Sequence, residues 1–445
     1  MVHDNTRRAM RFTACLACLI ASFSSWPGPA ATTPVSNAMK QDRQGKTVIL
    51  PLILRTVRVG QDPIVLAIDS QTGRVFVANA GVHVHGTLTS SVSVLDATTG
   101  AVLHTISLGH DLQAVALDEQ TRRVFVAGLA TVSMLDARTG VVLHTFRPSR
   151  SLRGLAVDER HNHILVTARG LIYVLDATTG VPWSAIPVDG YDVAVDGRAG
   201  RIFVQLDGCA PSADALTTTA CVDVLSTTGR QLGITLLPDF GDPVAINLDY
   251  FAWGVDERVG RAVIQYGDGR GGSYVGVVNT LTGKLVRTQP LGQGGGSVGT
   301  VAVDTQSGRA FVVTTAATYE GEHGAPNAVA TVFDTKSGRM LTNVVVASAE
   351  FGSIYPAGVG VDTRWGRVYV VTTPYTPSTP TPPRSTLSVL DARSGHIVRT
   401  LMLTRVAIPL AGFSGPATAV DERTGRLFIA NGTDNTVSVL DTARL

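Results

Sequence analysis

Residues 418–441 read TAVDERTGRLFIANGTDNTVSVLD and hold the pattern that decides the fold. Three short apolar runs, at 418–420, 426–430 and 437–440, are separated by turn-forming residues. Apolar and β-branched runs of this length, bounded by Gly, Asp, Asn and Thr, predict the strands of a meander. The three-and-four spacing of an amphipathic helix is missing. The stretch therefore predicts β-structure alone.

The same pattern repeats along the chain. A first motif, xAVDxxxGRVFV, recurs eight times, with its aspartates at Asp69, Asp118, Asp158, Asp196, Asp256, Asp304, Asp362 and Asp421. A second motif, VSVLDxxTG, follows each copy, and a further apolar run follows the first seven. Each unit therefore predicts four strands, here called a, b, c and d in chain order. A self-similar period of this kind indicates a repeat architecture.

The last unit stops without a fourth strand, and the start of the chain offers one. Residues 54–58, LRTVR, match the fourth-strand pattern of residues 398–401, VRTL. If this strand completes the C-terminal sheet, the ring closes and no terminal unit keeps an unpaired edge. We expect an all-β fold, a β-propeller of eight four-stranded blades over residues 47–445. Seven blades is the alternative, if one degenerate unit forms no blade.

A resemblance to a known family rests on three copies of strand b. RVFVANAG at 74–81, RVYVVTT at 367–373 and RLFIANG at 426–432, each followed by a VSVLD-type strand, resemble YVTN-type β-propeller repeats. The resemblance implies a propeller that works outside the cytoplasm. It implies little about function, because the family is chemically diverse. Two units depart from the pattern, with Ser226 and Asn279 where Asp96 and Asp391 stand elsewhere.

The N-terminus has the pattern of an export signal. Arg7, Arg8 and Arg11 precede an apolar run, and small residues follow it, which predicts a signal peptide over 1–31. The run is too short to span a bilayer, so we expect no transmembrane segment in the mature chain. Residues 32–46 predict a flexible lead-in. The protein would be exported, to a periplasm, a cell surface or the medium.

Cysteine and charge support the same setting. Cys209 and Cys221 remain after the signal is removed, and we expect them to form a disulfide, with a metal or reactive-thiol role as the weaker alternative. Of the 37 basic and 35 acidic side chains, residues 1–31 contain three and one, so the rest of the chain is balanced. A balanced chain offers no electrostatic footprint for nucleic acid, and we expect none as a partner.

Loop lengths predict which face binds a ligand. The a–b and c–d turns are short and nearly uniform, whereas the b–c and d–a segments vary and are rich in aromatic residues. Variable loops on a rigid scaffold carry function, with neutral drift as the alternative. We therefore expect an unknown protein, peptide or saccharide to bind this face or the mouth of the central channel. The residues expected to contribute are Tyr250, Tyr319, Tyr355, Tyr375 and Phe413.

Histidines offer a second kind of site. His83 and His85 would point to one side of an extended segment, and His110 lies in the crossover to the next blade. Three imidazoles could hold zinc or copper with an open position. The alternative is three solvated loop histidines, and no other cofactor is expected.

Motifs for catalysis are weak. G-x-S-x-G at 295–299 and G-x-G-x-x-G at 267–272 lack the strand-to-helix turn that their chemistry needs. DATTGVPW at 176–183 comes close to the tryptophan repeat of quinoprotein dehydrogenases, but its Trp is one place early and no other unit has it. We expect a binding or interaction scaffold. The alternative is an enzyme, either a metal-assisted, lactonase-like hydrolase or the propeller subunit of an oxidoreductase.

Overall fold

The computed structural model describes residues 38–41, 47–50, 53–84, 87–148, 151–206, 209, 220–237, 251–267, 272–293, 299–317, 326–348, 353–375, 384–403 and 417–445. The chain divides into two compact units, Met1–Val35 and Ser36–Leu445. The first unit, and with it the predicted signal peptide, lies outside the described residues.

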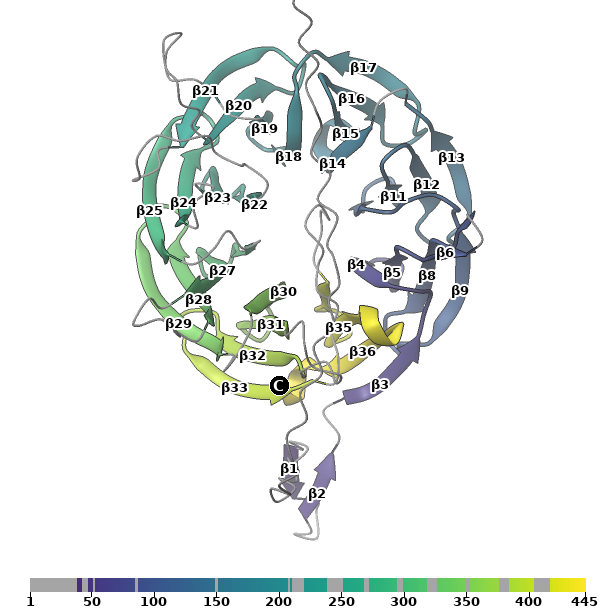
Figure 1. Cartoon of the computed structure of the whole chain (residues 1–445), viewed down its shortest axis with the longest axis vertical. Coiled ribbons are helices and arrows are strands. Elements are labelled where there is room, and N and C mark those ends of the chain that lie inside the picture. Colours follow the sequence, from purple (N-terminus) through teal and green to yellow (C-terminus); the bar gives the residue numbers. More distant parts are fainter. Residues whose placement is uncertain are drawn as a thin grey trace, which may run out of the picture. The chain divides into compact units, whose positions relative to one another are not determined.

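The second unit contains eight four-stranded antiparallel sheets arranged in a ring, as predicted (Figure 1). The first four blades, each given from strand a to strand d, are as follows. Blade 1 contains β4 (Pro63–Asp69), β5 (Arg74–Asn79), β8 (Ser91–Asp96) and β9 (Val102–Ser107); blade 2 contains β10 (Ala114–Asp118), β11 (Arg123–Ala127), β12 (Val132–Asp136) and β13 (Val142–Phe146). Blade 3 contains β14 (Leu152–Asp158), β15 (His163–Ala168), β16 (Leu171–Asp176) and β17 (Pro182–Ile186); blade 4 contains β18 (Gly190–Asp196), β19 (Arg201–Leu206), β20 (Ala220–Ser226) and β21 (Gln231–Leu237).

The other four blades continue in the same order. Blade 5 contains β22 (Phe251–Asp256), β23 (Arg261–Gly267), β24 (Gly272–Asn279) and β25 (Leu285–Gln293); blade 6 contains β26 (Thr300–Asp304), β27 (Arg309–Ala317), β28 (Pro326–Asp334) and β29 (Met340–Ser348). Blade 7 contains β30 (Ser353–Asp362), β31 (Arg367–Tyr375), β32 (Thr386–Asp391) and β33 (Ile397–Met402); blade 8 contains β34 (Thr418–Asp421), β35 (Arg426–Asn431), β36 (Thr436–Asp441) and β3 (Ile53–Arg58). Three short 3₁₀ turns, η1 (Glu159–His161), η2 (Gly432–Asp434) and η3 (Thr442–Arg444), complete the regular structure.

The ring is closed by the first strand of the propeller. Strand β3 pairs with β36 in antiparallel register, with Arg55 opposite Val439 and Val57 opposite Val437. The sheet order β3-β36-β35-β34 therefore joins the two ends of the propeller chain in one blade. This confirms the prediction that residues 54–58 supply the missing fourth strand.

A small hairpin precedes the propeller in the sequence. Strand β1 (Ala38–Gln41), within the predicted lead-in, pairs with β2 (Thr47–Leu50). The β-branched and apolar side chains of β2 favour an extended backbone, and pairing supplies its hydrogen bonds. A second small hairpin, β6 (His83–Val84) with β7 (Thr87–Leu88), lies between β5 and β8.

The hydrophobic core is divided among the junctions between blades. The buried side chains form eight clusters, and each one combines residues of two neighbouring blades. At the closing junction, for example, Val75 and Val77 of blade 1 pack with Phe428 and Val439 of blade 8. Because every sheet is covered on both faces, strand b has apolar side chains on both of its faces, and the large chain needs no single large core.

Each outer strand starts with a β-bulge. In all eight blades the pairing of strands c and d shifts by one residue just after the c–d turn. The extra residue is always large and apolar, and 38–62% of its surface is exposed. These residues are Leu54, Leu103, Leu143, Trp183, Leu232, Val286, Leu341 and Val398.

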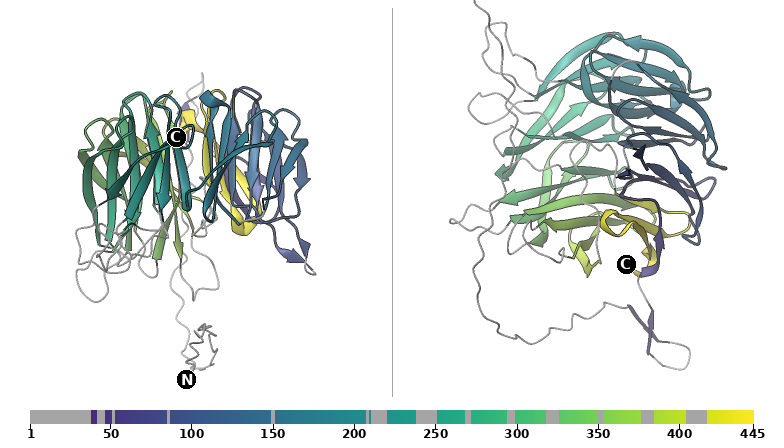
Figure 2. Two further views of the ribbon diagram at one scale, coloured as in Figure 1. Left: turned by 90° about the horizontal axis from the view of Figure 1, so that it is seen from above. Right: turned by 45° about the vertical axis from the view of Figure 1, so that its right-hand side comes forward.

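The strand order separates two faces of the ring. Because the strands of each blade are antiparallel and run through the thickness of the ring, all a–b and c–d turns lie on one face and all b–c and d–a segments on the other (Figure 2). In every blade, the Asp that ends strand a is opposite the first residue of strand b. The b–c segments, in contrast, range from residues 169–170 in blade 3 to residues 207–219 in blade 4. We call the two faces the turn face and the loop face.

Candidate functional site

The turn face is a scaffold built from one repeated hydrogen-bond pattern. The Asp that ends strand a is at most 2% exposed in all eight blades. In blade 1, Oδ1 of Asp69 accepts the backbone N–H groups of Gln71 (2.9 Å) and Thr72 (3.0 Å), and its Oδ2 accepts the Thr72 hydroxyl (2.7 Å). The turn of blade 1 thus satisfies its own buried carboxylate, as an Asx turn does.

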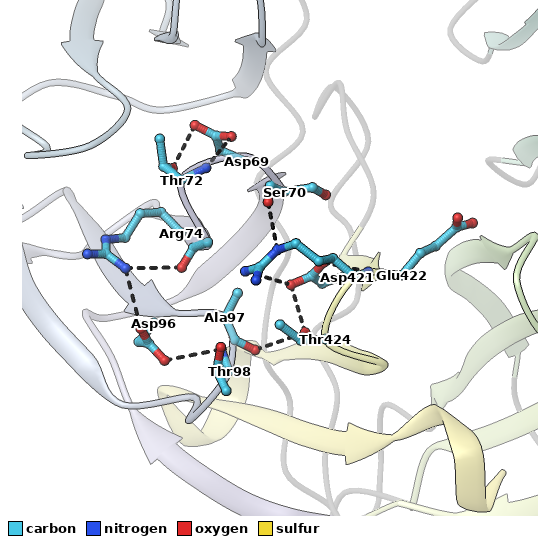
Figure 3. A network of polar contacts seen from close by, with 12 residues as sticks. Asp69, Ser70, Thr72, Arg74, Asp96, Ala97, Thr98, Asp421, Glu422 and Thr424 are labelled. Atoms are coloured by element: carbon cyan, nitrogen blue, oxygen red, sulfur yellow. Dashed lines mark hydrogen bonds and ion pairs between the residues drawn. The ribbon is translucent and has the colours of Figure 1, made fainter.

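Neighbouring turns are also bonded to one another. Figure 3 shows the junction of blades 8 and 1, where the Thr424 hydroxyl bonds Asp421 (2.7 Å) and the carbonyl oxygen of Ala97 (3.2 Å). The Arg423 side chain donates from Nε to the carbonyl oxygen of Ser70 (2.8 Å). Such links hold adjacent blades in register, which is a structural role and explains why these residues recur.

Five blades share an ion pair at the c–d turn. The Arg that begins strand b contacts the Asp that ends strand c, for example Arg74 with Asp96 at 3.3 Å. The other four pairs are Arg123–Asp136, Arg309–Asp334, Arg367–Asp391 and Arg426–Asp441. Burial opposes ionisation of Asp96, but hydrogen bonds from Thr99 and Thr98 and the Arg74 charge outweigh it and lower its pKa.

Blades 3, 4 and 5 lack this pair. His163 replaces the Arg in blade 3, where Asn162 donates to Asp176 instead (2.8 Å). Ser226 and Asn279 replace the Asp in blades 4 and 5, as the sequence showed. These three consecutive blades therefore form a sector that departs from the repeat on the turn face.

Inner strands are bulged near the loop face in blades 1, 3, 4 and 7, and the bulges of blades 3 and 4 carry charged and aromatic side chains. Strand β14 has a bulge that sets Arg153 and Gly154 opposite Thr167, and β18 has one that sets Tyr191 and Asp192 opposite Gln205. Bulges redirect side chains and are frequent beside functional sites. Strands β14, β18 and β22 are the inner strands of their blades, so these residues lie on the inner wall of the ring, towards the loop face (Figure 1).

Arg153 is fixed between the two bulges. Its guanidinium lies over the Tyr191 ring, 3.9 Å from the ring centroid, and contacts Asp189 Oδ1 at 3.3 Å. Asp189 Oδ1 also accepts the backbone N–H of Gly170 (2.9 Å). The cation–π contact and the ion pair together leave the Arg153 side chain little freedom, so it presents a defined cationic surface.

Asp192 is the unusual group of this cluster. Burial raises its pKa to about 6, although the N–H of Val193 (2.8 Å) and the indole of Trp253 in blade 5 act in the opposite direction. A Cβ on Gly154 of blade 3 would lie 2.5 Å from Asp192 Oδ1, so the carboxyl needs a glycine beside it. Among the described residues, no Lys or Arg forms an ion pair with Asp192.

The position of Asp192 is otherwise uncharged around the ring. Four places before the turn aspartate, the other blades have Val65, Ala114, Gly154, Ala252, Thr300, Gly358 and Ala417. One place later, Trp253 stands where the other blades have smaller residues. The sequence analysis missed Arg153, Tyr191, Asp192 and Trp253, which form our candidate functional site. Comparing equivalent repeat positions for a lone charge would have found Asp192.

The predicted aromatic residues are only partly covered by the structure. Tyr250, Tyr319 and Phe413 lie outside the described residues. Tyr355 lies in β30, half-buried and opposite Thr373, and Tyr375 ends β31 opposite Ser353. These two tyrosines therefore lie on adjacent strands of blade 7 near the loop face, but the Tyr375 side chain is not described. Their role in ligand binding stays a prediction.

The predicted histidine site also stays a prediction. His85 lies outside the described residues, as does the side chain of His83, whose backbone begins β6. His110 is bonded through Nδ1 to the carbonyl oxygen of Asp111 (2.9 Å) and through Nε2 to Ser133 (3.2 Å), and burial lowers its pKa. Within the described ranges, no three His, Cys, Asp or Glu side chains are close enough to hold a metal ion. Zinc and copper analysis of the protein and of His83→Ala would test the site.

The predicted disulfide is confirmed. Cys209 and Cys221 are bonded, with their Cα atoms 5.9 Å apart. The bond ties the start of the b–c segment of blade 4 to β20, in the same sector as the candidate site. No described segment forms a helix that could cross a membrane.

The comparisons with known proteins support the fold but identify no family. No family profile and no curated protein matches the sequence. BamB from Moraxella catarrhalis is 13% identical, with a TM-score of 0.55 over 87% of this chain and 99% of that one. The Dos1 propeller has a TM-score of 0.58 at 11% identity, over 87% and 94%. A europium-containing methanol dehydrogenase has 0.54 at 12%, over 85% and 84%.

These likenesses are of fold. The chain is a β-propeller. Identities this low leave open whether it belongs to the YVTN-repeat family, and they assign neither a binding partner nor a reaction.

Proposed function

We propose that this protein is an exported propeller scaffold that binds a partner protein or peptide on its loop face, by holding a cationic group of the partner at Asp192. The disulfide supports export, because such bonds persist in oxidising compartments. The sequence of residues 1–31 supports it independently.

The observation that carries the proposal is the unmatched carboxyl of Asp192. A half-buried carboxyl without a cation is costly to ionise, and its raised pKa expresses that cost. An amino or guanidinium group from a ligand would favour the ionised form. The Tyr191 and Trp253 rings beside it offer the flat apolar surface on which a lysine or arginine stem packs.

The site is suited to recognition because it is rigid and unrepeated. Arg153 is held by Tyr191 and Asp189, and Asp192 is held by its own bulge. Arg153 would pair with a carboxylate of the same partner or repel a second cation. The two opposite charges would thus favour one orientation of the bound partner. Preorganised groups of this kind lower the entropy cost of binding.

Binding of charged peptides tests the proposal. Octapeptides that differ only in a central Lys, Glu or Ser would be titrated into the purified protein at pH 7.5 and pH 5. The Lys peptide should bind best at pH 7.5, where Asp192 is ionised, and Asp192→Asn should weaken it by about tenfold or more. Asp111→Asn, which removes an exposed carboxylate of another blade, is the matched control.

Equal affinity of Asp192→Asn and the unmodified protein for the Lys peptide would overturn the proposal. Preference for the Glu peptide would do so as well.

A further inference from the structure

A second site, independent of the proposed function, lies on the outer rim of the ring between blades 4 and 5. A cavity of about 300 Å³ is lined by the run from Leu232 to Leu236 in β21 and by the run from Leu281 to Leu285, which includes the c–d turn of blade 5. Arg201 and Val224 complete its wall. None of these residues belongs to the Asp192 cluster.

One wall of the cavity is an exposed apolar stripe. Leu232, Ile234 and Leu236 are 39%, 50% and 40% exposed, and Leu281 across the cavity is 62% exposed. Strand β21 reads QLGITLL and has no charged side chain, although it is the outer edge of its sheet. The outer strands β9, β13 and β29 also have no Asp, Glu, Lys or Arg, so what distinguishes β21 is the cavity that lies beside its apolar edge.

The mouth of the cavity is cationic because two carboxylates of the repeat are missing. In five blades, the Arg at the position of Arg201 is paired with an Asp, but blade 4 has Ser226 there. Arg201 instead donates to the carbonyl oxygens of Ala199 (3.1 Å), Gly200 (3.0 Å) and Leu281 (3.5 Å). Its charge therefore has no carboxylate partner among the described residues.

The second cation comes from the next blade. Lys284 follows the turn glycine of blade 5, is exposed, and lines the cavity. Asn279 replaces the Asp of that blade, so this turn also lacks its carboxylate. The acidic residue of β20, Asp223, is buried and bonded to Gln231 (2.9 Å).

We propose that this cavity binds an alkyl carboxylate of the fatty-acid class, with its head group between Arg201 and Lys284 and its chain along Leu232, Ile234 and Leu236. An apolar wall with a cationic mouth complements a ligand that has an apolar chain and an anionic end. A neutral saccharide would leave the two cations unmatched, and a nucleic acid would not use the apolar wall.

Dodecanoate, used below its micelle concentration, is the test ligand for the intact protein. Equilibrium dialysis should show one saturable site, about tenfold or more weaker for dodecanol and not measurable for acetate. Lys284→Gln should reduce the affinity about fivefold to tenfold, and Leu236→Asn by a similar factor. Circular dichroism of each variant checks that the ring is intact.

The repeat supplies matched controls in blade 6. Arg339→Gln changes the residue of blade 6 equivalent to Lys284, and Val345→Asn changes the one equivalent to Leu236, and neither lines the cavity. Both should leave dodecanoate binding unchanged, as should Asp192→Asn. Equal losses in the control variants would mean that the ligand binds the apolar rim in general, and would overturn the proposal.

Two further results would overturn it. Dodecanol lacks the carboxylate that the two cations would hold, so it should bind more weakly than dodecanoate. Equal affinities of the two ligands would contradict the proposed role of Arg201 and Lys284. Binding of an acidic peptide such as acetyl-Leu-Glu-Leu-amide in preference to dodecanoate would show that the cavity accepts a polypeptide.

Discussion

Blades 1, 2, 6, 7 and 8 close their c–d turns with the same Arg–Asp pair, whereas blades 3, 4 and 5 do not. The three exceptional blades also contribute the residues of the Asp192 cluster, the disulfide and the rim cavity. In a ring of equivalent units, a residue that recurs serves the scaffold. A residue that occurs once, in a sector where several others also occur once, is a candidate for function.

The contrast is clearest between two carboxyls. The buried Asp421 of blade 8 accepts hydrogen bonds from the donors of its own turn on both of its oxygens. Asp192 of blade 4 has the N–H of Val193 and the Trp253 indole, and burial raises its pKa. The first carboxyl stabilises the fold and the second costs stability. This difference can be measured.

The largest expected effect comes from breaking a scaffold turn. Asp421→Ala leaves the N–H of Arg423 without its acceptor and removes one of the two acceptors of the Thr424 hydroxyl, at the junction of blades 8 and 1. We expect the free energy of unfolding to fall by about 3 kcal/mol, because each unsatisfied buried donor costs about 1–3 kcal/mol. The midpoint of urea unfolding measures this, with Asp111→Asn as the control. A loss below about 1 kcal/mol would contradict a scaffold role.

The opposite sign is expected at Asp192. With its pKa at about 6 in the folded protein and 3.8 as the ordinary value, the native state retains a proton that the unfolded chain has lost. The stability from this site is complete below about pH 4 and is lost as the pH rises to about 6. The free energy of unfolding of Asp192→Asn minus that of the unmodified protein should therefore be about 2–3 kcal/mol larger at pH 7.5 than at pH 3.5.

Urea unfolding of both proteins across this pH range measures the difference. A constant difference between them from pH 3.5 to 7.5 would show that Asp192 does not titrate as inferred.

A smaller loss is expected when a repeated ion pair is removed. Asp96→Asn abolishes the contact with Arg74 and weakens the acceptor of the Thr98 and Thr99 N–H groups. The pair is partly exposed, so we expect a loss of about 1 kcal/mol at pH 7. Raising the salt concentration should narrow the difference between variant and parent, because screening weakens the parent's pair. No salt effect would mean that the turn hydrogen bonds, and not the charges, carry the contribution.

The smallest effect is expected when the pair is restored in blade 5. Asn279→Asp places a carboxylate where Arg261 could meet it, and should add at most about 0.5 kcal/mol. It also neutralises the nearby rim, so dodecanoate binding should weaken while binding of the Lys peptide stays unchanged. Unchanged dodecanoate binding would show that the missing carboxylate at position 279 does not determine the charge of the rim cavity.

The fold was predictable because the repeat makes its signals redundant. The turn aspartate and the apolar b strand each occur eight times, so each indicates the same repeating unit. Residues 54–58 match the one fourth strand that the last unit lacks. The disulfide was predictable because only two of the four cysteines lie beyond the predicted signal peptide, and two cysteines allow one pairing. The hairpin of β1 and β2 was not, since a short polar run such as AMKQ becomes a strand only when it has a partner.

The candidate site was not predictable from loop composition. The sequence analysis looked for aromatic residues on long loops, while the cluster lies on inner strands, at bulges that set two residues opposite one. No local signal in GYDVAVD announces a bulge, because it arises from pairing with β19. The surroundings of Asp192 likewise come from the neighbouring blades: Gly154 leaves room for its carboxyl, and the Trp253 indole opposes the rise in pKa that burial causes.

The pairing of β3 with β36 also fixes an order of assembly. Seven blades are made of strands that follow one another directly, so each can form soon after its own segment is available. Blade 8 needs a strand from before blade 1 and three from after blade 7, and contacts this distant in sequence form slowly. Until strands β34, β35 and β36 have folded, β3 has no pairing partner and the sides of blades 1 and 7 that face blade 8 are uncovered. We therefore expect the pairing of β36 with β3 to be the last step that completes the ring.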